Sequence, residues 1–408
     1  MDQKKTFIDR IKAAGPAAVI TSAFIGPGTI TTATNAGVNF GYALLWAVVF
    51  SGIASIIIMN MATRLAVVGR SNIIDASVSL LPNSQAWKYF ALGLIALVVI
   101  LTGFGFEAGN LIGATTGFSN ITGISQSVSA VLMGLLTFAA IVFSTPKLIE
   151  TVMKVFVGVM GIIFVLTAVI VGPNIGDVFL GLVPTIPDGA LITTIALVGT
   201  TIIAINLVFH SVASTDKYTS ESSLDDAYFD TKLNISLGVV MTLGLIITTS
   251  ATLFGTGTAV TSPIVYAQAL EATLGTGARI FAATGLVFAG LSSAIATPYM
   301  VGQIWKRIFK WDDKNDLKAK ITASVIVVFG TVLAALGTTP VPIILSAQAT
   351  SGVFLPFIAV LFLLATNSEK LGKYKNSLRQ NIFGLVMVAV MFTLGIRTIM
   401  NVLTRLFS

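Results

Sequence analysis

The sequence has no cysteine and a single histidine in 408 residues. Disulfides, thiolate metal sites and cysteine nucleophiles are therefore excluded. Charged residues are also scarce, at 10% of the chain, whereas a typical soluble domain carries about 25%. Hydrophobic residues account for 55%, and the mean hydropathy is +0.93. A composition this apolar excludes a soluble domain and indicates an integral membrane protein.

Apolar runs of about 20 residues, the length of a membrane-spanning helix, predict an all-α protein with about eleven spans. Before them lies a basic, polar segment, 1–13, which we expect to be a cytoplasmic tail and not a cleaved signal peptide. The expected spans are 14–38, 42–67, 88–117, 125–144, 148–172, 190–214, 231–255, 279–304, 320–338, 342–366 and 381–403.

The basic residues alternate with these spans. If the N-terminus is cytoplasmic, all of the 24 lysines and arginines except Arg279, Arg397 and Arg405 fall in or beside cytoplasmic segments, as the positive-inside rule requires. This placement explains the net charge of +7, which therefore does not indicate nucleic-acid binding. An odd number of spans puts the C-terminus outside. We expect the acidic runs DDKNDLKAK and SSLDDAYFD to be solvated cytoplasmic faces.

The first span is interrupted in its middle by Gly26, Pro27 and Gly28, and a run rich in threonine and asparagine follows. Proline cannot donate a backbone hydrogen bond, and the glycines ease unwinding. Unwound backbone inside a bilayer is tolerated only where it lines a cavity or is buried in protein. A broken span is therefore a site candidate and is typical of secondary transporters. The alternative is a simple helix kink.

Three further spans carry polar side chains at membrane depth. They are Glu107 and Asn110 in the third span, Thr200, Thr201, Asn206 and His210 in the sixth, and Gln348 in the tenth. The first and sixth spans would occupy corresponding positions in two inverted five-helix repeats. We expect these repeats at 14–172 and 190–366, with 381–403 as an extra helix. A break in the sixth span is less strongly indicated, because that span has no proline.

Several motifs occur in the order found in the NRAMP family of proton-coupled divalent-metal transporters. Among them are GPAAVITSAFIGPGT, MATRLAVVGRSNIIDA, EAGNLIGATTGF, NLVFHS, FAGLSSAIATPYMVGQ and QATSGVFLPF. The chain resembles this family over nearly its whole length. The resemblance implies a LeuT-type fold, with ten spans in two inverted halves and one additional span.

The resemblance also implies where the substrate binds and where this chain differs. The family binds metal through the Asp and Asn of a D-P-G-N motif and through a Met and an Ala carbonyl of the sixth span. Gly26, Thr29 and Ile203 stand at the Asp, Asn and Met positions of this chain. The family's tenth-span Gln is matched by Gln348, and its second sixth-span His by His210.

Replacing a carboxylate and a thioether removes the charged and the soft ligand. We therefore assign no metal site, and we expect a neutral, hydroxyl-rich, roomy pocket. The expected substrate-binding residues are Gly26, Pro27, Gly28, Thr29, Thr200, Thr201, Ile203, Asn206 and Gln348. The favoured function is transport of a small solute by alternating access, with no cofactor and no enzymatic activity. The alternatives are a divalent-cation (Mn/Mg-type) transporter with an altered site, and a channel or sensor on a transporter scaffold.

The resemblance further implies a route for a coupling proton. In the family, protons move through the first-span Asp and through acids of the third span. Here Glu107 is left to carry a proton, Asn110 replaces the second acid, and His210 and Lys217 lie towards the cytoplasm. An acid at membrane depth is costly and usually functional, whereas a lone His is as often a packing residue. Sodium coupling through Ser292 and Ser293 is the less favoured alternative, because small serine pairs also pack helices.

Overall fold

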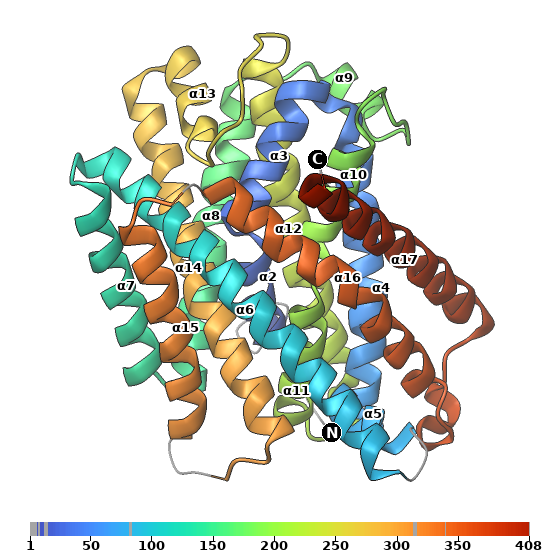
Figure 1. Ribbon diagram of the computed structural model, residues 1–408. Coiled ribbons are helices and arrows are strands. Elements are labelled where there is room, and N and C mark those ends of the chain that lie inside the picture. The colour runs from blue at the N-terminus through green and yellow to red at the C-terminus, as the bar shows by residue number, and fades with distance from the viewer. Residues whose placement is uncertain are drawn as a thin grey trace.

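The chain folds into helices joined mostly by short loops (Figure 1). A computed structural model describes residues 6, 9–11, 15–80, 84–312, 316–338 and 340–407, and for 80, 272–273, 340–350, 352–353, 394, 397–399 and 401–407 it gives the helix without the side chains. The helices are α2 (Pro16–Phe24), α3 (Pro27–Phe40), η1 (Gly41–Leu44), α4 (Leu45–Val67), α5 (Ile73–Leu80), α6 (Gln85–Thr122), α7 (Gln126–Phe143), α8 (Pro146–Ile170), α9 (Ile175–Leu180), α10 (Leu191–Thr201), α11 (Ala204–Lys217), η2 (Glu221–Ser223), α12 (Leu224–Leu253), α13 (Val265–Leu274), α14 (Thr276–Ile308), α15 (Leu317–Ala335), α16 (Pro340–Thr366), η4 (Glu369–Tyr374) and α17 (Leu378–Phe407).

The helices account for all the predicted spans. Within the described residues, eight helical stretches are long and apolar enough to cross a membrane, among them one that joins α3 to α4 and one that joins α10 to α11. Helices α16 and α17 contain shorter apolar pieces. Each of the eleven predicted apolar segments lies on one helix or on a pair of helices, α2 with α3 and α10 with α11. Most of the predicted tail, 1–13, lies outside the described residues, and the division into two inverted repeats stays a prediction.

The first predicted break is present, between α2 and α3. Ile25 and Gly26 leave the helical conformation, and Pro27 takes the first position of α3. Proline suits that position because its fixed φ is helical and its missing N–H would have no partner there. The sequence therefore ends one helix and starts the next within two residues.

A second break separates α10 from α11. Ile202 (φ −101°, ψ 93°) and Ile203 (φ −111°, ψ 134°) are extended between two helical segments. β-Branched side chains suit extended backbone, so the chain unwinds here without proline or glycine. The hydroxyl of Ser351 on α16 accepts a hydrogen bond from the Ala204 N–H, 3.4 Å away, at the start of α11.

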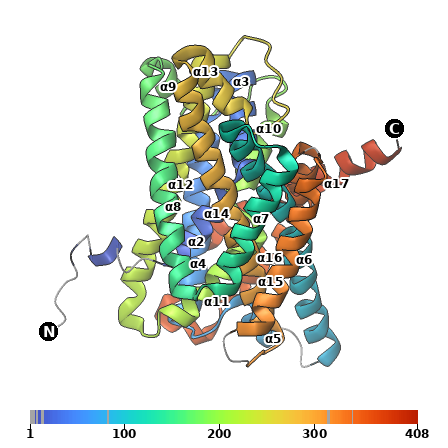
Figure 2. The ribbon, with the colours of Figure 1, turned by 90° about the vertical axis from the view of Figure 1, so that its left-hand side faces the viewer.

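The broken helices lie in the interior of the bundle. The short helices α9 and α13 lie at one end of the molecule, and α5 lies at the other (Figures 1 and 2). The long helices α6 and α14 pack along one another, and a Cβ at Gly290 of α14 would stand 2.4 Å from the Ala114 backbone nitrogen of α6. Small residues permit this close approach. On one flank, α7 and α15 lie side by side.

Candidate functional site

A small cavity lies where the two helix breaks face α6 and α14. It is lined by Ala23, Phe24, Gly26, Gly28, Thr29, Phe106, Asn110, Thr200, Ile203, Ile205, Asn206 and Thr297. The space that the centres of water-sized molecules can reach is about 20 Å³, close to what one water needs. The pocket is neutral and carries hydroxyls and amides, as expected, but the expectation of a roomy pocket is wrong for this conformation.

Hydroxyl groups satisfy the last carbonyls of α2, which have no partner within the helix. The Ser293 hydroxyl, on α14, donates to the carbonyls of Ser22 at 2.8 Å and Ala23 at 3.1 Å. The Ser292 hydroxyl lies 3.2 Å from the same Ser22 carbonyl. The Thr29 hydroxyl donates to the Phe24 carbonyl across the break. Side-chain hydrogen bonds therefore stabilise the break between α2 and α3.

Gly26 stands where its neighbours leave no room for a side chain. A Cβ at this position would lie 2.7 Å from the Ser293 hydroxyl oxygen and 3.1 Å from Asn110 Oδ1. A carboxylate at position 26 would need both side chains to move. Gly26 and Ser293 thus fit one another, and the serine occupies space that an acidic ligand would need.

Two of the predicted substrate-binding residues, Pro27 and Thr201, do not line the cavity, and a third, Gln348, falls outside the described side chains. Pro27 packs against α6, where a Cβ at Gly113 would meet its ring at 2.1 Å. The Thr201 hydroxyl lies 3.3 Å from that of Ser51 on α4, so Thr201 faces α4. Gln348 lies on α16 among the residues whose side chains are not described. The other six predicted residues meet at the cavity.

Part of the lining was not predicted from the sequence. Phe106 and Thr297 reach the cavity from α6 and α14, and the Asn110 amide donates to the Thr297 hydroxyl at 3.3 Å. Ala23, Phe24 and Ile205 complete the set. Phe106 could have been found from its position, one helical turn before Asn110. Nothing in the sequence singled out Thr297.

Asn206 is the lining side chain best placed to bind a substrate. It is 1% exposed, and neither its Oδ1 nor its Nδ2 has a hydrogen-bond partner within the described residues. A buried amide without partners costs free energy. Asn206 therefore offers the cavity one acceptor and one donor group for a ligand or a water molecule.

Glu107 lies one turn before Asn110 on α6 but faces a different neighbour. It is fully buried, and a Cβ at Gly330 of α15 would lie 2.9 Å from its Cγ. Neither carboxyl oxygen has a hydrogen-bond partner of normal geometry in the described part of the chain. Helix α6 thus presents Asn110 to the cavity and Glu107 to α15.

His210 lies deeper along α11, away from the cavity lining. Its Nε2 lies 2.9 Å from the Thr63 hydroxyl of α4 and 3.2 Å from the Thr231 hydroxyl of α12. At the end of α11, Lys217 pairs with Glu150 of α8 at 2.9 Å. The four residues of the predicted proton pathway therefore lie in separate surroundings, and only Asn110 lines the cavity.

A buried carboxylate holds the start of α2. Asp230 of α12 accepts hydrogen bonds from the Gly15 N–H at 3.0 Å, the Ala17 N–H at 3.4 Å and the Tyr218 hydroxyl at 3.0 Å. Asp230 is fully buried, so the expectation that SSLDDAYFD is a solvated face is wrong at its last residue. An anion at a helix N-terminus is favourable. We call this group of Asp230, Gly15, Ala17 and Tyr218 the α2 latch.

The residues of the cavity can hold a hard cation or a polar solute, but they are a poor soft-metal site. The lining offers hydroxyl, amide and backbone oxygens, and its described side chains include no carboxylate or thioether. No group of three or more His, Cys, Asp or Glu side chains that could hold a metal occurs within the described residues. Hard divalent cations prefer oxygen ligands, and a carboxylate normally supplies charge.

A family model described as "Natural resistance-associated macrophage protein-like" matches residues 17–401. The chain belongs to the NRAMP family. Its relatives include the divalent metal cation transporter MntH of Yersinia enterocolitica, with 26% identity over 391 residues and 93% of each chain covered. The corresponding MntH of Klebsiella pneumoniae is 25% identical over 391 residues, which cover 93% of this chain and 92% of the relative.

Solved structures share the fold of this NRAMP protein. The Eremococcus coleocola manganese transporter superposes with a TM-score of 0.83 at 19% identity, over 98% of this chain and 88% of that one. Mhp1, a nucleobase-cation-symport-1 family transporter, gives a TM-score of 0.62 at 14% identity, over 96% and 93%. The predicted all-helical, LeuT-type membrane fold is confirmed, as are the predicted family and the prediction of a transporter and not an enzyme.

Proposed function

We propose that this NRAMP-family secondary transporter carries a hard divalent cation, of the Mg²⁺ or Mn²⁺ type, through the cavity at the two helix breaks. The observation that carries the proposal is the size and chemistry of that cavity. It has room for about one water-sized particle, and its polar groups are hydroxyls, amides and the backbone of both breaks. An ion fits this space, whereas an organic solute does not fit this conformation. The relatives named above are divalent metal transporters.

The missing carboxylate predicts weak binding. Mg²⁺ usually retains several waters and is bound through one or two carboxylates. Thr29, Thr200 and Asn206 can replace part of the water shell but supply no negative charge. Weak binding is compatible with transport, because a carrier must also release its substrate.

Movement of α2 is the proposed means of opening the cavity to one side of the membrane. The α2 latch fixes the N-terminal end of this short helix, and the break at Gly26 separates it from α3. Releasing the latch would let α2 move while α3 stays packed against α12. By the positive-inside rule, the latch faces the cytoplasm, with the N-terminal tail on the same side.

A small polar organic solute is a second candidate, favoured by one specific observation. Asn206 offers both a donor and an acceptor, and none of the described side chains that line the cavity is charged. Such a solute would need a wider cavity than the one seen here. A channel or sensor is less compatible with a chain whose two broken helices meet at a closed cavity.

A thermal-shift screen of the purified full-length protein separates these candidates. A ligand that binds only the folded state raises the melting temperature in proportion to ln(1 + [L]/Kd). We expect millimolar Mg²⁺ or Mn²⁺ to stabilise the wild type, and to stabilise Asn206→Leu much less. Stabilisation by small organic acids but by no divalent cation would replace the cation proposal with the solute proposal.

A further inference from the structure

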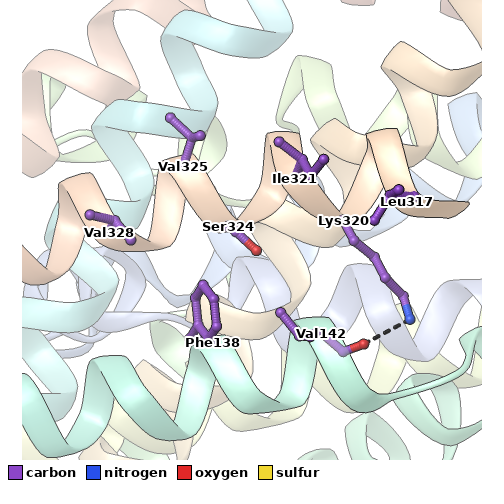
Figure 3. A pocket seen from close by; sticks show the side chains of 8 residues that line it. All are labelled: Phe138, Val142, Leu317, Lys320, Ile321, Ser324, Val325 and Val328. Carbon is purple, nitrogen blue, oxygen red and sulfur yellow. Dashed lines mark hydrogen bonds between the residues drawn. The ribbon is translucent and has the colours of Figure 1, made fainter.

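An apolar groove runs along the flank of the molecule between α7 and α15 (Figure 3). It has a volume of about 600 Å³ and is lined by Phe138, Val142, Leu317, Lys320, Ile321, Ser324, Val325 and Val328. The six α15 residues recur at the spacing of one helix face. We propose that this groove binds an anionic phospholipid of the bilayer, with an acyl chain along α15 and the phosphate at Lys320.

The length of the groove matches one leaflet of a membrane. Its α15 residues extend from Leu317 to Val328, which is about 16 Å of helix at 1.5 Å per residue. The hydrocarbon of one leaflet is about 15 Å deep, half of the roughly 30 Å core. An acyl chain lying in the groove would therefore span its own leaflet, with its headgroup at the Lys320 end.

The walls of the groove are apolar and open to lipid. Ile321, Val325 and Val328 are each more than half exposed. Figure 3 shows Phe138 extending from α7 towards α15, with Val328 further along α15, away from Lys320. These side chains can contact a hydrocarbon chain along its length. Between them, α7 and α15 form a recess and not a flat surface.

Lys320 supplies the charge that selects an anionic headgroup. Its Nζ reaches across the groove and donates to the Val142 carbonyl in the last turn of α7, at 2.8 Å (Figure 3). An ammonium group has three N–H donors, so this bond leaves donors for phosphate oxygens. Basic pockets between membrane helices near the cytoplasmic surface are a known chemistry for anionic lipid headgroups.

The charge around the Lys320 end of the groove also favours an anion. Lys147 is exposed close to Val142 in the sequence. Among the described residues no Asp or Glu lines the groove, and Asp316, just before α15, pairs with Lys306. A neutral phospholipid would gain the same apolar contacts but not the full attraction to this basic end.

Native mass spectrometry of the full-length protein tests the proposal directly. The protein is mixed with equal amounts of phosphatidylglycerol and phosphatidylcholine that carry the same acyl chains, and the bound lipids are counted. We expect the wild type to prefer phosphatidylglycerol, and Lys320→Met to reduce that preference about five-fold, as loss of one cation near the surface implies. Lys320→Arg should retain the preference.

Two further variants separate the effect of charge at this end of α15 from the effect of the groove itself. Lys318→Met removes the same charge from the same end of α15 but outside the groove, and should retain most of the preference. Val325→Trp fills the groove without changing charge and should lower binding of phosphatidylglycerol. The proposal is overturned if Lys320→Met and Lys318→Met behave alike, if Val325→Trp binds lipid as the wild type does, or if both lipids bind equally to the wild type. Circular dichroism confirms that each variant is folded.

Discussion

Asp230 on α12 accepts a hydrogen bond from the backbone N–H of Gly15, the residue just before α2, over 3.0 Å. The two residues are 215 positions apart in the chain. Lys217 crowds the same place, since a Cβ at Gly15 would lie 1.7 Å from its Nζ. The start of the first broken helix is therefore fixed by residues that follow the second broken helix.

Loss of the Asp230 charge should release α2. Hydrogen bonds to charged groups contribute about 1.5–3 kcal/mol each. Asp230→Asn should therefore shift the equilibrium between the closed and the open α2 latch by about ten-fold or more towards the open state. The absence of native cysteine allows a single Thr21→Cys reporter in the buried part of α2. Maleimide should label this cysteine faster in Asp230→Asn than in the wild type. Asp225→Asn, an exposed acid on the same helix, is the matched control, and equal labelling in both variants would contradict the role of the latch.

The Tyr218 hydroxyl should make the latch sensitive to alkali only. Burial and the neighbouring Asp230 raise the pKa of the Tyr218 phenol above its ordinary value of 10.0. Because the pKa is raised in the folded state, the contribution of the phenol to the free energy of unfolding is complete below pH 10. That contribution is lost as the pH rises beyond this value. We expect the melting temperature to fall above about pH 10 more steeply in the wild type than in Tyr218→Phe. Parallel curves for the two proteins would show that the phenol does not contribute in this way.

A larger residue at position 26 should lower the stability of the protein unless Ser293 is also replaced by a smaller residue. Overpacking a filled site costs about 1–3 kcal/mol, and Gly26→Asp would place its Cβ 2.7 Å from the Ser293 hydroxyl. We expect Gly26→Asp to lower the melting temperature and Gly26→Asp/Ser293→Ala to regain part of it. Calorimetry should then detect tighter Mn²⁺ binding in the double variant. Unchanged stability in Gly26→Asp would refute the fit between these two residues.

Glu107 is the residue that we expect to couple transport to protons. It is the acid buried on α6 next to the cavity residue Asn110. Glu107→Gln should abolish the increase of uptake in acidic medium while leaving substrate binding largely intact, because Glu107 does not line the cavity. Glu271→Gln, at the Arg279 pair, serves as the control. Uptake in Glu107→Gln that still responds to pH would exclude this role.

The spans and the first break could be predicted because their signals are local. Long apolar runs mark the helices, and Gly26, Pro27 and Gly28 mark the break by the backbone properties of those residues. The second break carried no such mark, because β-branched residues such as Ile202 and Ile203 occur throughout the apolar spans of this chain, helical ones included. The extended conformation of Ile202 and Ile203 depends on contacts such as the one between Ala204 and Ser351, which the sequence does not show.

The cavity and the latch could not be predicted, because they depend on residues brought together by the fold. Ser293 of α14 lies close to Gly26, and Phe106 of α6 lines the pocket together with Thr29. Asp230 looked like part of a solvated acidic run, yet it is buried against α2. In each case the residue type was visible in the sequence and its partner was not.

The decisive measurement is the uptake of Mn²⁺ or Mg²⁺ into proteoliposomes that contain either the wild type or a variant at Asn206. Asn206 lines the cavity with both amide atoms unpartnered within the described residues, so Asn206→Leu removes polar groups from the site. We expect saturable uptake by the wild type, at least about ten-fold lower uptake by Asn206→Leu, as for a loss of about 1.4 kcal/mol, and normal uptake by Asn39→Leu on the exposed end of α3. Divalent-cation uptake no greater than in protein-free liposomes, or uptake unaffected by Asn206→Leu, would contradict transport of these ions through this cavity.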